Sequence, residues 1–80
     1  MIYTYQAPTG NVHVKIGFSK SDDYFLSGQV WDDKRGLIDF GYKVISDSKK
    51  LEPSILPDTL PPSMTIAILK AVQRVLDAMV

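Results

Sequence analysis

The chain has 80 residues, and its nine lysines and arginines are balanced by nine aspartates and glutamates. This length predicts one small domain over residues 1–80, and the zero net charge argues against the basic surface by which duplex DNA is usually bound. No cysteine is present, which excludes disulfides and thiolate zinc sites and favours a reducing compartment.

The first 46 residues alternate between apolar and polar side chains, as half-buried strands do. Prolines, glycines and aspartates divide this region by three hairpin turns. In the first hairpin we expect Ala7 to face Val12. In the third we expect Trp31 to face Leu37, with Gly36 in a left-handed conformation that closes a bulge. The four predicted strands cover residues 2–7, 12–18, 24–31 and 37–46.

The predicted registers support one another, because together they put the apolar side chains on one face of the sheet. They also place Gly28 opposite Phe40, where we expect the ring to lie over the glycine. The alternative for this glycine is a bulge or a bend of the sheet. The predicted inner face comprises Met1, Tyr3, Tyr5, Ala7, Val12, Val14, Ile16, Phe18, Tyr24, Leu26, Gly28, Val30, Ile38, Phe40, Tyr42 and Val44.

The segment 47–62 contains four prolines, which exclude a long helix or a central strand. We expect an ordered connector whose apolar residues lie along the edge of the core; a flexible linker is the alternative. A helix is about 10 Å wide and four strands span roughly 15–19 Å, so one helix cannot cover the sheet alone. The connector or a second subunit must cover the rest. The connector residues expected at the core are Leu51, Ile55, Leu56 and Leu60.

The last segment has the three- and four-residue spacing of an amphipathic helix. Ser63 is the expected N-cap, after which residues 64–80 form the helix. The predicted fold is therefore α+β: a four-stranded antiparallel meander (1–46), a Pro-rich connector (47–62), and one C-terminal helix (63–80) packed on one face. The predicted apolar stripe of the helix comprises Thr65, Ile68, Leu69, Val72, Val75, Leu76 and Met79.

The opposite face of the sheet also carries large apolar side chains, including Ile45, where polar residues would be expected. A contiguous apolar patch on a small protein usually marks a contact, and tryptophan is common at binding hot spots. In the alternative interpretation, the connector folds over this face and makes it core. The candidate partner-binding residues are Phe25, Trp31, Leu37, Gln29, Asp39, His13, Lys15 and Lys43.

No catalytic or metal-binding motif stands out, so we expect a protein that is not an enzyme and uses no cofactor. His13 is the only histidine, and scattered aspartates do not complete a zinc site with it. Two acidic pairs, Asp22–Asp23 and Asp32–Asp33, fit turn chemistry, with calcium binding as the weaker alternative. The first and third turns should lie together at one end of the sheet.

The order of elements, four antiparallel strands and then a helix, resembles that of Whirly-type and positive-cofactor-type single-strand DNA-binding domains and of PUR repeats. The resemblance covers topology only. It implies dimerisation and the binding of bases on the sheet, for which His13, Lys15, Phe25, Trp31 and Lys43 would supply stacking and phosphate contacts.

The leading functional expectation is a small non-catalytic protein-interaction module, such as a stand-alone inhibitor or accessory protein of phage or mobile-element type. Single-stranded nucleic-acid binding is possible but less favoured, and a homo-oligomeric small-ligand binder is a third alternative. The N-terminal residues do not resemble a signal peptide, and no apolar stretch is long enough to span a membrane. We therefore expect a complete small cytoplasmic gene product that forms a homodimer or an obligate complex.

Overall fold

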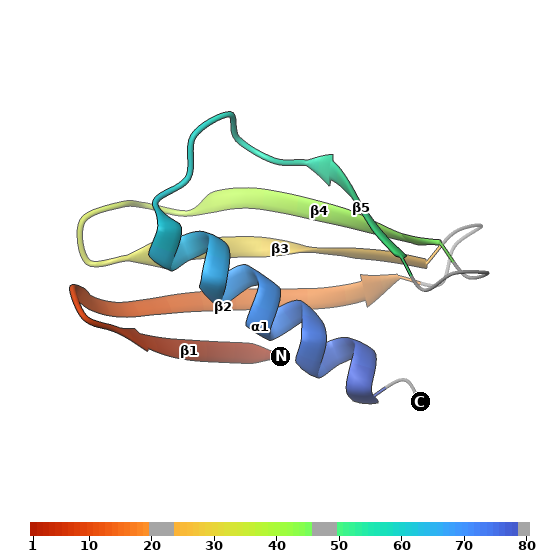
Figure 1. Cartoon of the computed structure of the whole chain (residues 1–80), viewed down its shortest axis with the longest axis horizontal. Helices are drawn as coiled ribbons and strands as arrows, with labels where there is room; N and C mark the ends of the chain where they lie inside the picture. The colour runs from red at the N-terminus through yellow and green to blue at the C-terminus, as the bar shows by residue number, and fades with distance from the viewer. Residues whose placement is uncertain (20–23, 46–49, 79–80) are drawn as a thin grey trace.

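The computed structural model describes residues 1–19, 24–45 and 50–78. It shows one antiparallel sheet whose strands follow chain order, with a single helix lying across one side (Figure 1). The α+β class is confirmed, but the sheet has five strands rather than four. The elements are β1 (Ile2–Ala7), β2 (Gly10–Ser19), β3 (Tyr24–Asp32), β4 (Ile38–Ile45), β5 (Lys50–Ile55) and α1 (Pro62–Ala78).

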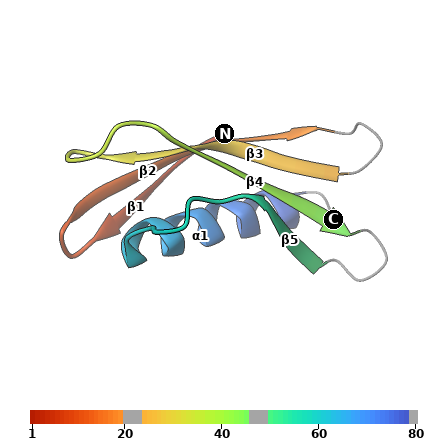
Figure 2. The ribbon, with the colours of Figure 1, turned by 90° about the horizontal axis from the view of Figure 1, so that it is seen from above.

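The additional strand, β5, comes from the segment that was predicted to be a connector. Pro53 pairs with Tyr42 of β4, and a proline is tolerated there because the outer side of an edge strand has no ladder to complete. The pairing shifts by one residue at Gly41 and Tyr42. Figure 2 shows β5 and the residues after it on the same side of the sheet as α1. The connector therefore does not cover the other face.

The connector contributes less to the core than predicted. Leu60 packs against the buried cluster, whereas Ile55 and Leu56 are exposed. The side chain of Leu51 lies outside the described residues. Strand pairing at the sheet edge, rather than a row of buried leucines, holds this segment in place.

The first hairpin is two residues tighter than predicted. Ala7 pairs with Gly10 and Tyr5 with Val12, so Pro8 and Thr9 alone form the loop. Gly10 has a φ of 131°, a conformation that side-chain-bearing residues rarely adopt. A shift of two residues preserves the alternation of the strand, so every side chain remains on its predicted face.

The third hairpin agrees with the predicted register, since Val30 pairs with Ile38 and Gly28 with Phe40. The expected contact of the Phe40 ring with Gly28 stays a prediction, but the structure gives this glycine another role. A β-carbon at Gly28 would overlap the carbonyl oxygen of Lys15, so this glycine permits a close approach of two strand backbones. Gly36 is also not left-handed, because Gly10 is the one glycine with positive φ in the described chain.

The predicted inner face is the core. The buried members of the sheet are Val12, Val14, Ile16, Leu26, Val30, Phe40 and Tyr42, with Tyr3, Tyr5, Ala7, Phe18 and Ile38 packed partly against them. Met1 is the exception, being 54% exposed. The side chains of Tyr24 and Val44 lie outside the described residues.

The helix is rotated relative to its predicted stripe. Thr65 and Leu69 are exposed, because the smaller side chains of Ala67 and Ala71 let the backbone of α1 approach the sheet closely. Met79 lies outside the described residues. The buried helical residues are Met64, Ala67, Ile68, Ala71 and Val72.

The helix also begins earlier than predicted, with Pro62 in its first turn and Ser63 already helical. Proline suits this position because its missing N–H would have no partner inside the helix. The amides of Met64 and Thr65 both donate to the carbonyl oxygen of Pro61. The predicted N-cap role of Ser63 is therefore wrong, and the carbonyl before the helix satisfies its first donors.

Candidate functional site: the open face of the sheet

One face of the sheet has no other described element packed on it. Helix α1 contacts β1, β2 and β3 from the inner side, and β5 turns toward that same side (Figure 2). Within residues 1–19, 24–45 and 50–78, the opposite surface of β1 to β4 is therefore uncovered. We call this surface the open face, formed by Ile2, Thr4, Gln6, Asn11, His13, Lys15, Gly17, Phe25, Ser27, Gln29, Trp31, Asp39, Gly41 and Lys43.

An aromatic pair forms one end of the open face. His13 and Trp31 are cross-strand partners, and their rings stack with centroids 5.6 Å apart at an angle of 30°. The hydroxyl of Thr4 on β1 lies 3.1 Å from Nδ1 of His13, within hydrogen-bond distance. This contact and the ring stack orient the imidazole. The sequence interpretation missed Thr4, because the assumed register of the first hairpin placed another residue opposite His13.

A polar row crosses the middle of the open face. Lys15, Gln29 and Asp39 are successive cross-strand neighbours on β2, β3 and β4. The side-chain amide of Gln29 donates to the Asp39 carboxylate at 3.2 Å. Lys15 and Asp39 are exposed at the two sides of Gln29, so charges of both signs lie beside the aromatic pair.

A second aromatic ring lies further along the face. Phe25 covers Gly41 of the neighbouring strand, since a β-carbon there would be 2.7 Å from Cζ of the ring. A ring-over-glycine contact of the kind predicted at Gly28 is therefore seen at Gly41. Phe25 pairs with Lys43, which in turn pairs with Glu52 of β5. Directly opposed residues share a face, so this row also combines a cation and a carboxylate with an aromatic ring.

Small residues make a shallow depression between the two aromatic ends. Gly17 and Ser27 face each other across β2 and β3. With Lys15, Gln29 and Met1 they line a hollow of about 390 Å³, completed by the adjoining backbone of the two strands. The open face is therefore contoured, with raised aromatic residues on either side of a low centre.

Two of the predicted apolar members do not extend this surface. Leu37 is 68% exposed and precedes β4, whose recorded pairing with β3 ends at Val30 and Ile38. The predicted pairing of Trp31 with Leu37 is not part of the β3–β4 ladder, and the cross-strand partner of Trp31 on β2 is His13. The side chain of Ile45 lies outside the described residues. The remaining seven candidates lie on one continuous face.

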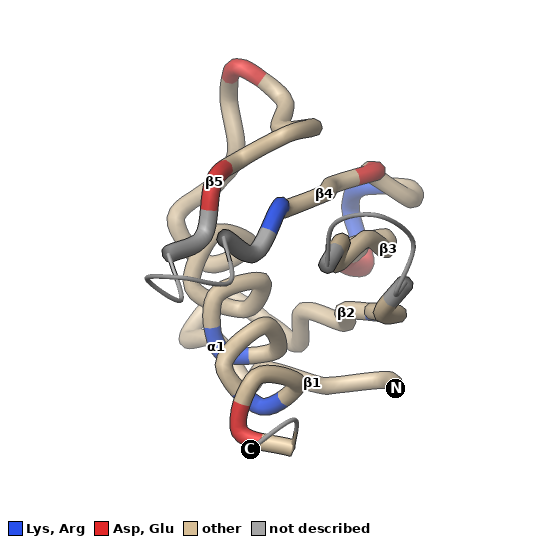
Figure 3. Tube along the Cα trace, turned by 90° about the vertical axis from the view of Figure 1, so that its right-hand side faces the viewer, with Lys and Arg blue, Asp and Glu red and all other residues tan. Residues whose placement is uncertain are grey.

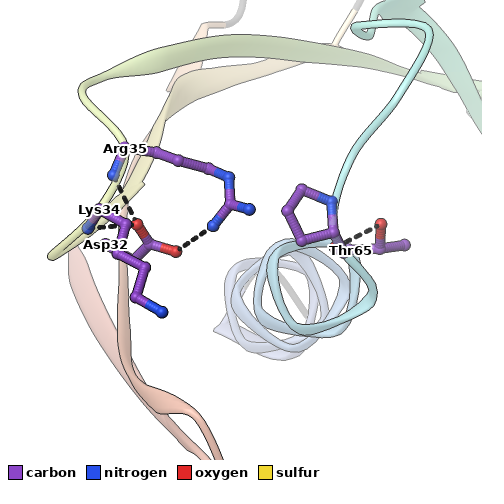
Figure 4. Close-up of polar contacts among 5 residues, drawn as sticks. Asp32, Lys34, Arg35 and Thr65 are labelled. Carbon is purple, nitrogen blue, oxygen red and sulfur yellow. Dashed lines mark hydrogen bonds and ion pairs between the residues drawn. The ribbon is translucent and has the colours of Figure 1, made fainter.

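The first and third turns lie together, as predicted, and line a cavity of about 330 Å³ with the start of α1. Asp32 organises this end: its carboxylate accepts from the amides of Lys34 and Arg35 and from the Arg35 guanidinium at 3.0 Å (Figure 4). Burial by itself raises the pKa of Asp32, but the two backbone amides and Arg35 outweigh it and lower that pKa. These groups satisfy one another's hydrogen bonds, so the polar contacts at this cavity are explained by the structure of the turn.

Other sequence candidates add no second site. The pair Asp22–Asp23 lies outside the described residues. Among the residues that the structure describes, no three histidine, aspartate or glutamate side chains are grouped as metal ligands would be. No helix in the described part of the chain has the length and apolar character needed to cross a bilayer.

Comparisons of the chain with protein-family models, with curated proteins and with solved structures give no match. The topological resemblance to Whirly-type, positive-cofactor-type and PUR domains therefore rests on the order of elements alone, and β5 extends the sheet beyond that four-strand order. Function has to be inferred from the open face itself.

Proposed function

We propose that this chain is a small non-catalytic protein-interaction module that binds its partner through the open face. The observation that carries this proposal is the combination of half-buried aromatic rings with balanced charge on a face of the sheet that no described element covers. Trp31 and Phe25 supply large contact area at two ends of a contoured surface. Aromatic residues dominate binding energy at many protein interfaces.

The distribution of charge favours a protein partner over a phosphate backbone. Lys15 and Lys43 are the lysines of this face, and Asp39 together with Glu52 at its border supplies two carboxylates. A surface that binds polyanions concentrates cations so that counterions are released on binding. Mixed charge around apolar anchors is instead typical of the polar rim of a protein interface.

A stand-alone inhibitor or accessory protein is the form of module that we favour, acting in the cytoplasm and of phage or mobile-element type. This step rests on the small size of the chain and on its lack of a catalytic motif, by analogy with other short binding proteins.

The test of this proposal is Trp31→Ala, with Leu69→Ala as the matched control. Leu69 is a large apolar residue that is 47% exposed on α1, on the other side of the sheet. Partners captured from a lysate with nuclease present are identified, and the affinity of each purified partner is measured. We expect Trp31→Ala to weaken binding by about 2–4 kcal/mol with a nearly unchanged thermal midpoint, and Leu69→Ala to bind normally.

Equal losses in both variants, or no loss in either, would exclude the open face as the binding surface.

Single-stranded nucleic-acid binding is the second candidate, because the stacked His13–Trp31 pair next to Lys15 could hold a base. Nuclease-sensitive capture, with an affinity that falls steeply with salt, would support that candidate instead.

Self-association remains a further proposal. Ile55, Leu56 and Ile66 are between 38% and 52% exposed, all outside the open face. A second copy that covered them would form the expected homodimer, and a small ligand could then bind between the subunits. Sedimentation equilibrium at tens of micromolar tests this proposal, since a monomer without partner would exclude it.

A further inference from the structure

The two edges of the sheet are protected to very different degrees. At one edge, β5 contains Pro53, carries Lys50 and Glu52, and is bulged against β4. Such features are typical of edge strands that avoid pairing with other chains. At the other edge, β1 has the sequence IYTYQA, with no charge, no proline and no glycine. The edge of β1 is therefore open to a further strand.

The backbone of β1 has unused hydrogen-bonding groups in the right places. Met1 exchanges both backbone hydrogen bonds with Ile16, at 3.0 Å each. Because such pairs alternate along an antiparallel ladder, the amides and carbonyls of Ile2, Thr4 and Gln6 point away from β2. No strand in the described part of the chain pairs with that side of β1.

Two cations of α1 lie above the same edge. The ammonium of Lys70 is 5.6 Å from the ring centroid of Tyr5, and the guanidinium carbon of Arg74 is 4.9 Å from that of Tyr3. Figure 3 shows the basic segments of α1 beside β1. The two tyrosines are exposed enough to be reached because they belong to the outermost strand, where they are only partly buried.

Among the residues that the structure describes, neither cation forms an ion pair with a carboxylate. The ion pair found there joins Arg35 to Asp32 at the third turn. Asp77, the acidic residue of α1, accepts a hydrogen bond from Gln73 at 2.8 Å. Lys70 and Arg74 therefore add positive charge to an uncharged strand edge.

The spacing of these cations matches that of an added strand. Residues four apart on a helix rise by about 6 Å, and alternate residues of a strand are about 6.7 Å apart. A strand paired with β1 would put every second side chain on the helix side, next to Tyr3 and Tyr5. Two carboxylates at alternate positions would then lie near Arg74 and Lys70.

We propose that the edge of β1 binds an extended acidic segment of a partner protein as a sixth strand, with alternate carboxylates set against Lys70 and Arg74. Strand addition of this kind takes affinity from main-chain hydrogen bonds and specificity from alternate side chains. A second copy of this chain is a poorer occupant, because pairing β1 with β1 would bring the Lys70 and Arg74 cations of two copies together. The proposal concerns the backbone edge of β1 and the side of the sheet that α1 covers, and it does not depend on the function of the open face.

The probe is an eight-residue synthetic peptide in which glutamates alternate with threonine and valine. Its matched control replaces every glutamate by glutamine, and a second control is N-methylated at the alternate amides that would face β1. Binding to the full chain is followed by amide NMR shifts and hydrogen exchange. We expect the glutamate peptide to shift and protect the amides of Ile2, Thr4 and Gln6, and to bind about tenfold more tightly than the glutamine peptide.

Variants of the protein locate the charge contact. Lys70→Gln and Arg74→Gln should each weaken the glutamate peptide about three- to tenfold, whereas Lys34→Gln at the third turn should not. The N-methylated peptide should fail to bind. This control tests the main-chain hydrogen bonds with the wild-type protein, so a folding defect cannot explain the result. Equal binding of the glutamate and glutamine peptides, perturbations elsewhere, or no binding at millimolar peptide would overturn the proposal. Two further results would also overturn it. One is loss of peptide binding because two copies of the chain pair through β1, and the other is a single-stranded oligonucleotide that binds this edge more tightly than the glutamate peptide does.

Discussion

The two faces of the sheet are made from the same strands but are organised by different interactions. On the inner face, Val14 is fully buried beneath α1, whereas Lys15, the next residue, is exposed on the open face. The inner face depends on close packing against a helix. The open face depends on pairwise contacts, such as the His13–Trp31 stack, that need no covering element. A surface held in this way keeps its shape while it remains available to a partner.

The sharpest way to test this contrast is to place the same charge on adjacent residues. Val14→Asp should unfold the domain, because an unpaired buried carboxylate costs several kcal/mol against a total stability on the order of 5 kcal/mol. Lys15→Asp should melt close to the wild-type temperature. Circular dichroism melts of both variants decide the matter, and a cooperative wild-type-like melt for Val14→Asp would disprove the assignment of the core.

The glycines of neighbouring strands provide a second comparison. Gly28→Ala should destabilise the domain by roughly 2–4 kcal/mol, since the new β-carbon would overlap backbone atoms of Lys15 and Ile16. Gly17→Ala should cost far less, because its β-carbon would come no closer than 4.0 Å to the carbonyl oxygen of Ser27. Urea denaturation of the two variants measures the difference. Similar midpoints would show that the strands do not need this close approach.

On the open face, the contact between Phe25 and Gly41 should be worth less than any core contact. Gly41→Ala should cost about 1 kcal/mol, because the tip of the Phe25 ring can move away from the new methyl group. In a Phe25→Ala background the same glycine substitution should be nearly neutral. A double-mutant cycle isolates this coupling. Strict additivity of the two substitutions would mean that the ring does not cover the glycine.

The smallest expected effect concerns pH at the third turn. The folded-state pKa of Asp32 lies below its ordinary value of 3.8. Its contribution to stability should therefore be complete above that value and be lost as the pH falls through the lower folded-state pKa. Asp32→Asn should flatten the stability profile in this acidic range, so that the variant is less stable than wild type near neutral pH and the two stabilities converge as the pH falls. If wild type and Asp32→Asn show the same dependence of stability on pH, the Asp32 carboxylate is not the group that causes the loss of stability in acid.

Within β1 to β4, the sequence by itself determined which side chains face inward and which face outward. Alternation has a period of two, so errors of two residues, such as that in the first hairpin, leave each side chain on its predicted face. The gathering of His13, Lys15, Phe25, Gln29, Trp31, Asp39 and Lys43 on one face was predictable for this reason. The pairing of Val30 with Ile38 was predictable too, because the length of the third turn fixes it.

Only the tertiary structure decided the remaining features. Prolines mark where a strand cannot be central but do not reveal an edge strand, so β5 required its partner β4. The rotation of α1 depended on how closely Ala67 and Ala71 could approach the sheet, which helical periodicity does not specify. The side on which the chain returns after β5 decided that the open face is uncovered (Figure 2). Each of these features depends on contacts between different elements of the fold, and the pattern within a single element does not encode them.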